Sequence, residues 1–286
     1  MKGLGTALIT PFKADGSVDY EALKRLLNTQ LTGFVDYIVV LGTTGEAATM
    51  SADEKREVRQ FIVKYVNGRL PLVLGVGGNN TAQVITDLKA MHNELILDYT
   101  AILSVCPYYN KPNQEGLYQH FCKVAEASPI PVILYNVPGR TGVNLLPETV
   151  MRIYEAHSDK IIGIKEASGN LEQIKHLIAI SSQHSAFNVI SGDDGIACEV
   201  MEAGGAGLIS VASNAFPEDF RTIVHKKDQA VQAKYAEMVR LLFAEGNPVG
   251  IKAVLAQKGI IQNYLRLPLV PASAKLNAQI QKELAN

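Results

Sequence analysis

Several features that often reveal what a protein does are scarce in this 286-residue chain. It contains no tryptophan, an absence that excludes nothing, and only three cysteines, Cys106, Cys122 and Cys198. Because their number is odd and no Cys-x-x-Cys spacing occurs, they form neither a disulfide framework nor a zinc ribbon. We interpret them as small packing residues of a cytosolic protein. The six histidines form no metal-binding pattern, so we expect no metal.

The chain also lacks a large excess of positive or negative charge, and it has no long apolar runs. The net charge is −1, with 27 Lys and Arg against 28 Asp and Glu. This balance argues against nucleic-acid and acidic-membrane partners, but a small anionic substrate needs only one or two local cations. Apolar runs such as 37–41 and 131–135 are far shorter than the roughly 18 residues of a membrane span. Since the first residues show no signal-peptide pattern either, we expect a cytoplasmic protein.

The chain does contain a regular alternation of short apolar runs and helical patterns. The runs that resemble buried strands are 7–10, 37–41, 72–76, 101–105, 132–135, 161–165, 187–190 and 207–211. Segments with apolar residues three and four positions apart lie between them, and in one of these Ser51 and Glu54 have the spacing of a capping box. Eight buried strands, each followed by a helix, predict an α/β fold, a (β/α)8 TIM barrel, over residues 1–225. The rest, 226–286, predicts a C-terminal helical extension.

In such a barrel, function lies on the loops that follow the strands. Lys165 ends the sixth predicted strand, where it could form a Schiff base if apolar walls keep its amine neutral. Tyr135 ends the strand before it, so the two side chains are expected to be neighbours, and a phenol there could move protons. Alternatives for the two residues are a solvated lysine paired with Glu166 and a tyrosine whose hydroxyl is simply satisfied.

Two further loops could hold anions. Gly-Thr-Thr-Gly-Glu at 42–46 follows the second predicted strand and offers two hydroxyls and backbone N–H groups to a carboxylate. Arg140, on the loop after Tyr135, could bind a carboxylate through both guanidinium nitrogens. The simpler alternatives are a turn without a ligand and a surface arginine. The 42–46 loop lacks the spacing of a phosphate-binding P-loop.

Taken together, these stretches resemble the family of 4-hydroxy-tetrahydrodipicolinate (dihydrodipicolinate) synthases. That family belongs to the N-acetylneuraminate lyase superfamily of pyruvate-dependent class I aldolases. The resemblance covers essentially the whole chain and is carried by residues 42–46, 107–110, 135–142, 162–167 and 191–194. It implies condensation of pyruvate with L-aspartate 4-semialdehyde to 4-hydroxy-tetrahydrodipicolinate, in diaminopimelate and lysine biosynthesis. The implied enzyme is a Schiff-base-forming lyase without a cofactor.

The same resemblance implies a role for each catalytic residue. Lys165 would form the imine with pyruvate, and Tyr135 would act as general acid and base. Thr43 and Tyr109 would complete a proton relay with Tyr135, with Tyr109 reaching into the site of a neighbouring subunit. A homotetramer, arranged as a dimer of dimers, is the expected assembly.

The substrate-binding roles are also implied by the resemblance. Thr44 and the backbone at Ile209 would hold pyruvate. Arg140 would receive the carboxylate of the semialdehyde, with Gly192 and Asp193 as secondary contacts.

Two other functions are alternatives to this one. A sister aldolase would cleave a sugar acid such as N-acetylneuraminate, but Arg140 disfavours it because a polyol needs a hydroxyl-binding loop there. A catalytically inactive barrel that acts as a binding protein should have lost Lys165 or Tyr135, and this chain retains both.

We predict that lysine inhibits this protein weakly or not at all. By resemblance, the feedback site of lysine-sensitive relatives corresponds to Ala47, Ala48, Ala52, Lys55, Asn79, Gln83 and Tyr108. Bacterial members of that kind carry histidines at the positions of Ala52 and Lys55 and an acidic residue at that of Gln83. Here Gln83 offers no charge to an ammonium group and Lys55 repels it. A lysine titration of the activity tests this, and sub-millimolar inhibition would reject it.

Overall fold

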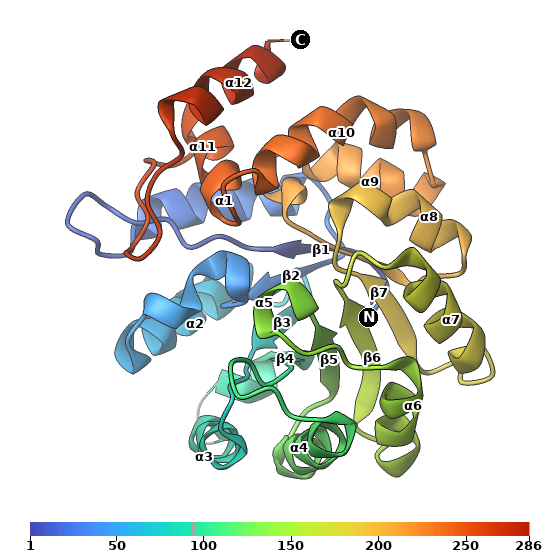
Figure 1. The fold of residues 1–286 in the computed structure, drawn as a ribbon. Coiled ribbons are helices and arrows are strands. Elements are labelled where there is room, and N and C mark those ends of the chain that lie inside the picture. The colour runs from blue at the N-terminus through green and yellow to red at the C-terminus, as the bar shows by residue number, and fades with distance from the viewer. Residues whose placement is uncertain (93–94, 286) are drawn as a thin grey trace. The chain divides into compact units, whose positions relative to one another are not determined.

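Eight parallel strands form a closed barrel in chain order (Figure 1). We analyse a computed structural model that describes residues 1–92 and 95–285. Its strands are β1 (Gly3–Ala7), β2 (Tyr37–Val40), β3 (Leu72–Gly75), β4 (Ala101–Val105), β5 (Val132–Asn136), β6 (Ile161–Glu166), β7 (Asn188–Ser191) and β8 (Gly207–Ser210). The predicted (β/α)8 barrel is therefore confirmed.

The helices alternate with the strands, as the periodicity predicts. They are α1 (Tyr20–Thr32), α2 (Ala52–Val66), α3 (Thr81–His92), α4 (Gln114–Ala127), α5 (Pro138–Thr141), α6 (Pro147–Ala156), α7 (Leu171–Ser181), α8 (Ala197–Glu202), α9 (Pro217–Lys226), α10 (Gln229–Phe243), α11 (Val249–Gln257) and α12 (Ala274–Leu284). The capping box at the start of α2 is confirmed, since Ser51 and Glu54 each bond the other's backbone N–H. Among the described residues, no helix is both long enough and apolar enough to span a membrane.

The first strand lies earlier than the sequence predicts. The apolar run 7–10 favoured a strand there, whereas β1 covers the glycine-containing residues Gly3–Ala7. The reason is packing, because a Cβ on Gly5 would lie 2.1 Å from the Tyr37 ring of β2. The strand thus needs a residue without a side chain at this point. The residues after Ala7 are buried but continue as a loop.

The chain divides into two compact units, which we describe separately: Met1–Gly3 with Pro71–Ile209, and Leu4–Leu70 with Ser210–Asn286. In the first unit, α3, α4, α6, α7 and α8 form a series in which each helix packs on the next. Figure 1 shows α4 and α6 side by side next to β5 and β6. These strands are almost wholly buried, as expected of a parallel sheet covered by helices.

The second unit contains the C-terminal helices. Helix α10 packs against α9, α11 and α12, and α11 also packs against α12. The Asn247-Pro248 and Leu267-Pro268 steps fall between successive helices of this group. The boundary between residues 225 and 226 stays a prediction.

Replacing Gly250 with alanine should destabilise the fold. A Cβ on this α11 residue would lie 2.4 Å from the backbone oxygen of Leu242 in α10. Backbone cannot move aside cheaply, so we expect a loss of about 1–3 kcal/mol from overpacking. This loss should outweigh the gain in helix propensity of up to about 1 kcal/mol. Urea denaturation measures the change, with Gly139→Ala as control because nothing lies within 4 Å of its Cβ. A Gly250→Ala midpoint equal to that of the control would contradict the expectation.

Candidate active site

The lysine and the tyrosine singled out in the sequence lie side by side in the first unit. Strands β5 and β6 pair in a register that sets Tyr135 opposite Lys165. The Lys165 Nζ lies 4.5 Å from the centre of the Tyr135 ring. Both side chains are buried, with exposed fractions of 6% and 7%. The pair therefore combines an amine and a phenol in a largely apolar environment, which is what amine attack on a carbonyl needs.

The residues after strand β7 pack directly against this lysine. A Cβ on Gly192 would lie 2.8 Å from Lys165 Cε and 2.5 Å from the Cβ of Ala167. Asp193 uses one carboxylate oxygen within its own turn, where it accepts a bond from Gly195 N at 2.8 Å. Ile209 in β8 is fully buried, one residue beyond the Leu208 that pairs with Ser191. Gly192 thus limits the space available to the Lys165 side chain, a steric constraint that sequence reasoning missed.

A second polar layer lies behind the pair, and sequence reasoning missed it as well. Asn136 and Glu166 follow Tyr135 and Lys165 and pair with each other in the same register, so they face the opposite side of the sheet. Fully buried Glu166 accepts bonds from Ser168 N at 2.7 Å, Asn136 Nδ2 at 2.9 Å and Gln173 Nε2 at 3.2 Å. Every partner donates, so the group fits as a carboxylate. The strict alternation of strand side chains was the signal that could have found this layer.

The same layer holds the loop that carries Arg140. Asn136 Oδ1 accepts a bond from Leu145 N at 2.9 Å, and Asn136 Nδ2 also donates to Asn144 Oδ1 at 2.7 Å. These two bonds attach the segment between Asn136 and Asn144, which includes Arg140, to the end of β5. The neighbouring Cys106 is a buried thiol whose pKa is raised by burial and then by the Glu166 charge. It is a packing residue, as its type and setting predict.

Tyr109 lies on an exposed loop and Arg140 on the short helix α5, both in the first unit. The Tyr109 side chain is 88% exposed and its backbone is left-handed, with φ of 74°. Its N–H donates to Thr141 O at 3.3 Å, which joins its loop to that of Arg140. Arg140 is exposed within the short helix α5. The Tyr109 ring therefore extends into solvent.

The threonine loop belongs to the second unit and is described within it. Thr43–Gly45 form a single 3-10 turn after β2. Thr43 is exposed, whereas Thr44 is only 3% exposed and its Oγ1 accepts a bond from Asn247 Nδ2 at 2.9 Å. Glu46 ends the turn in a left-handed conformation and forms an ion pair with Lys252. The loop is thus ordered by residues that the sequence reasoning did not connect to it.

The residues expected to form a degenerate lysine site are divided between the units. Ala48 is exposed and Lys55 half-buried in the second unit. In the first unit, Gln83 Nε2 donates to Asp87 Oδ1 at 2.8 Å, and Asn79 O accepts a bond from Asn110 Nδ2 at 2.9 Å. Tyr108 is 44% exposed. These contacts leave the Gln83 side chain directed along its own helix.

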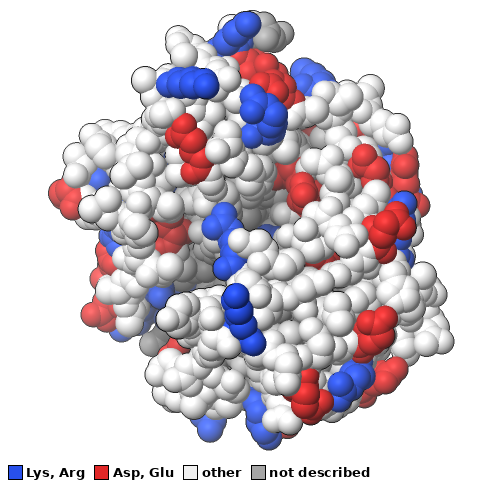
Figure 2. Space-filling model, in the orientation of Figure 1, with Lys and Arg blue, Asp and Glu red and all other residues white. Residues whose placement is uncertain are grey.

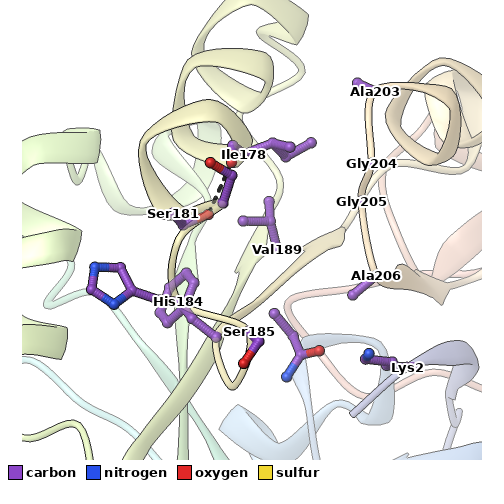
Figure 3. A pocket seen from close by; sticks show the side chains of 13 residues that line it. Lys2, Ile178, Ser181, His184, Ser185, Val189, Ala203, Gly204, Gly205 and Ala206 are labelled. Carbon is purple, nitrogen blue, oxygen red and sulfur yellow. Dashed lines mark hydrogen bonds between the residues drawn. The ribbon is translucent and has the colours of Figure 1, made fainter.

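A cavity of about 490 Å³ lies in the first unit, away from Lys165. Asn188 and Val189, which begin β7, line it together with the turn before β8 (Figure 3). Lys165 lies near the carboxyl end of β6, so the cavity is at the opposite end of these parallel strands. Two of its polar side chains already have partners, since Asn188 Nδ2 donates to Ile162 O at 3.0 Å and Ser181 Oγ to Ile178 O at 3.3 Å. We assign it no ligand.

Charge and metal ligands also point to a small local site. On the face drawn in Figure 2, Lys and Arg side chains are interspersed with Asp and Glu. In the part of the chain that the structure describes, no group of three or more His, Cys, Asp or Glu side chains could hold a metal ion.

Known proteins similar to this chain share one activity name. A model of the dihydrodipicolinate synthetase family matches residues 1–286. The chain is 48% identical to the 4-hydroxy-tetrahydrodipicolinate synthase of Parabacteroides distasonis over 291 residues, covering 99% of this chain and 96% of the relative. It is 50% identical to that of Flavobacterium psychrophilum over 285 residues, covering 97% and 95%.

Solved structures of dihydrodipicolinate synthases also superpose closely on this chain. The dihydrodipicolinate synthase of Thermotoga maritima superposes with a TM-score of 0.95 at 40% identity, covering 100% of this chain and 98% of that one. A monomeric dihydrodipicolinate synthase variant superposes equally well, with a TM-score of 0.95 at 40% identity and coverage of 100% and 96%.

Gly192→Ala should disturb the Lys165 side chain without disrupting the fold. The added methyl would press on Lys165 Cε and on Ala167, so the amine would leave its place above the Tyr135 ring. We expect the amine to react with a small carbonyl compound about tenfold or more slowly, as misplaced reacting groups do. The rate of borohydride reduction after carbonyl addition measures this. Gly139→Ala is the matched control, and equal rates in the two variants would refute the expectation.

Proposed function

Because the chain belongs to the dihydrodipicolinate synthetase family, we propose that it condenses pyruvate with L-aspartate 4-semialdehyde. The product is 4-hydroxy-tetrahydrodipicolinate, which enters diaminopimelate and lysine biosynthesis. The enzyme is a Schiff-base-forming lyase of the class I aldolase type. The observation that carries this proposal is the buried contact between Lys165 and Tyr135.

The first step uses the lysine amine as the nucleophile. Neutral Lys165 attacks the ketone carbon of pyruvate, the carbonyl oxygen leaves as water, and a protonated imine remains on Nζ. Loss of a proton from the pyruvate methyl group gives an enamine, whose carbon attacks the aldehyde of the semialdehyde. The amino group of that substrate then displaces Nζ, closes the ring and regenerates Lys165. The buried position of Lys165 beside Tyr135 supports this role.

Tyr135 is the general acid and base of these proton transfers. The position of its ring beside Nζ supports a part in the proton transfers at the reacting atoms. By the family pattern, Thr43 and Tyr109 extend the relay to solvent. The 88% exposure of Tyr109 in a single chain supports its donation to a neighbouring subunit.

Substrate binding is divided between neutral donors and one cation. The Thr44 hydroxyl and the backbone at Ile209 hold pyruvate, with Gly192 and Asp193 beside it. Arg140 receives the carboxylate of the semialdehyde. The exposed position of Arg140 on a loop tied to β5 supports this role, since the second substrate arrives from solvent. An Arg guanidinium can bind a carboxylate through two hydrogen bonds.

The wider organisation of the enzyme is part of the same proposal. It works as a cytoplasmic homotetramer, a dimer of dimers, with no cofactor besides the covalent imine. The three buried cysteines, which form no disulfide in the described part of the chain, support a reducing compartment. Residues 1–225 form the catalytic barrel, and residues 226–286, which contain α10, α11 and α12, form its helical extension.

Borohydride trapping with pyruvate tests the proposed function. We expect a reduced pyruvyl adduct on the peptide that contains Lys165, and none in Lys165→Ala. Lys160→Ala is the matched control, because this lysine bonds the Ser128 carbonyl and should leave trapping intact. A coupled assay with aspartate semialdehyde, compared with cleavage of N-acetylneuraminate, then identifies the second substrate. A folded protein without an adduct on Lys165 would refute imine chemistry, and cleavage of the sugar acid alone would refute the synthase.

A further inference from the structure

Residues from the C-terminal segment 247–266 hold the threonine loop Gly42–Glu46 in place. Asn247 Nδ2 donates to Thr44 Oγ1 at 2.9 Å. Lys252 forms an ion pair with Glu46, and the backbone N–H of Arg266 donates to Glu46 Oε2 at 3.1 Å. These partners are about 200 residues away from the loop in the sequence and lie in the same structural unit. The conformation of the loop therefore depends on the segment after α10.

The ion pair between Lys252 and Glu46 is fully buried. The exposed fractions of the two side chains are 0% and 1%. Lys252 Nζ also donates to Tyr264 O at 3.0 Å and lies 4.2 Å from the centre of the Phe12 ring. Burial lowers the Lys252 pKa to about 8, although the Glu46 charge acts in the opposite direction.

Stability alone does not account for such a pair. Two apolar side chains of similar volume often stabilise a fold equally well or better, because burying charges costs solvation. What an ion pair adds is a fixed mutual position of two side chains. Glu46 directly follows the turn that carries Thr43 and Thr44, so fixing its carboxylate fixes the end of that turn.

The hydrogen bond from Asn247 sets the direction of the Thr44 hydroxyl. An amide Nδ2 can only donate, so Thr44 Oγ1 is the acceptor in this bond. The hydroxyl proton of Thr44 is then available for a different acceptor. A substrate carboxylate is such an acceptor, and a donor aimed at it in advance loses little entropy on binding.

We propose that Asn247 and Lys252 are positioning residues for pyruvate: Asn247 presents the Thr44 hydroxyl as a donor, and the Lys252–Glu46 ion pair fixes the loop that carries it. This inference rests on the proposed function, because it assigns the pyruvate carboxylate to Thr44. It gives the C-terminal segment a role in substrate affinity rather than in the chemical steps.

Two substitutions of Asn247 test the direction of the hydrogen bond. Asn247→Ala removes the donor, and Asn247→Asp keeps a bond but lets the carboxylate accept the Thr44 proton. In both variants we expect KM for pyruvate to rise about tenfold or more, as for a lost hydrogen bond to a charged group, with kcat within about threefold of the parent value. If the contact between residue 247 and Thr44 were purely structural, Asn247→Asp would preserve it and KM for pyruvate would not change. An unchanged KM in Asn247→Asp would therefore overturn the proposal.

Asn277→Ala is the matched control for these variants. Its Nδ2 donates to Ala272 O at 2.7 Å and Ser273 O at 3.1 Å, both at the start of α12. We expect this variant to lower the thermal midpoint without changing KM for pyruvate. An equal rise of KM in Asn277→Ala would assign the effect to general loosening of the tail and overturn the proposal.

The ion pair is tested by a single and a double substitution. Lys252→Met alone leaves the Glu46 charge buried and unpaired, and we expect a strongly lowered thermal midpoint. Lys252→Met combined with Glu46→Met removes both charges, and should recover most of the midpoint while KM for pyruvate stays raised about tenfold. Recovery of both midpoint and KM in the double variant would refute positioning by the ion pair.

Failure of the proposed function is recognised separately. Borohydride trapping of pyruvate on Lys165 is first measured in the unsubstituted enzyme. The result of this measurement does not depend on the roles proposed for Asn247 and Lys252. A missing adduct there refutes the imine chemistry. A normal adduct together with unchanged KM in the Asn247 variants refutes only the positioning role.

Discussion

The pairing of β5 with β6 is the constraint on which the catalytic centre depends. One register sets Tyr135 opposite Lys165 and, one residue later, Asn136 opposite Glu166. Because side chains alternate across a sheet, the first pair faces one side and the second pair the other. A shift of one residue would exchange the two pairs and bury the amine among helix residues instead. The positions of the amine, the phenol and the polar layer behind them therefore all depend on this one register.

Two buried charged groups, Glu166 in the first unit and Lys252 in the second, have partners that suit their charge. Glu166 accepts bonds from three N–H donors, one of them a backbone group that cannot reorient. Lys252 is matched by Glu46 in the other unit. An unmatched charge at either position would cost several kcal/mol, so these groups make the fold intolerant of single substitutions. Their hydrogen bonds also hold the residues next to them in the chain, Lys165 beside Glu166 and Thr44 near Glu46, in defined positions.

The nearly neutral composition agrees with a site that depends on a few local groups. Pyruvate and aspartate semialdehyde are small carboxylates, and under the proposed function one arginine, hydroxyls and backbone donors would be enough to bind them. Electrostatic steering by a large positive surface is not needed for substrates of this size. The absence of space around Gly192 is as important as any charge, because it holds the Lys165 side chain over Tyr135.

The sequence by itself determined the barrel, most element boundaries and the proximity of Lys165 and Tyr135. These follow from local periodicity and from the order of neighbouring strands, both of which a single sequence displays. It misplaced β1, whose glycines look unlike a strand until the Tyr37 ring is packed against Gly5. It also missed Glu166 and Asn136 as a network, Gly192 as a steric limit, and Asn247 and Lys252 as partners of the threonine loop. Only the tertiary structure decided these contacts. Hydrogen bonds and steric limits between residues far apart in the chain arise when the chain closes on itself, and no local pattern records them.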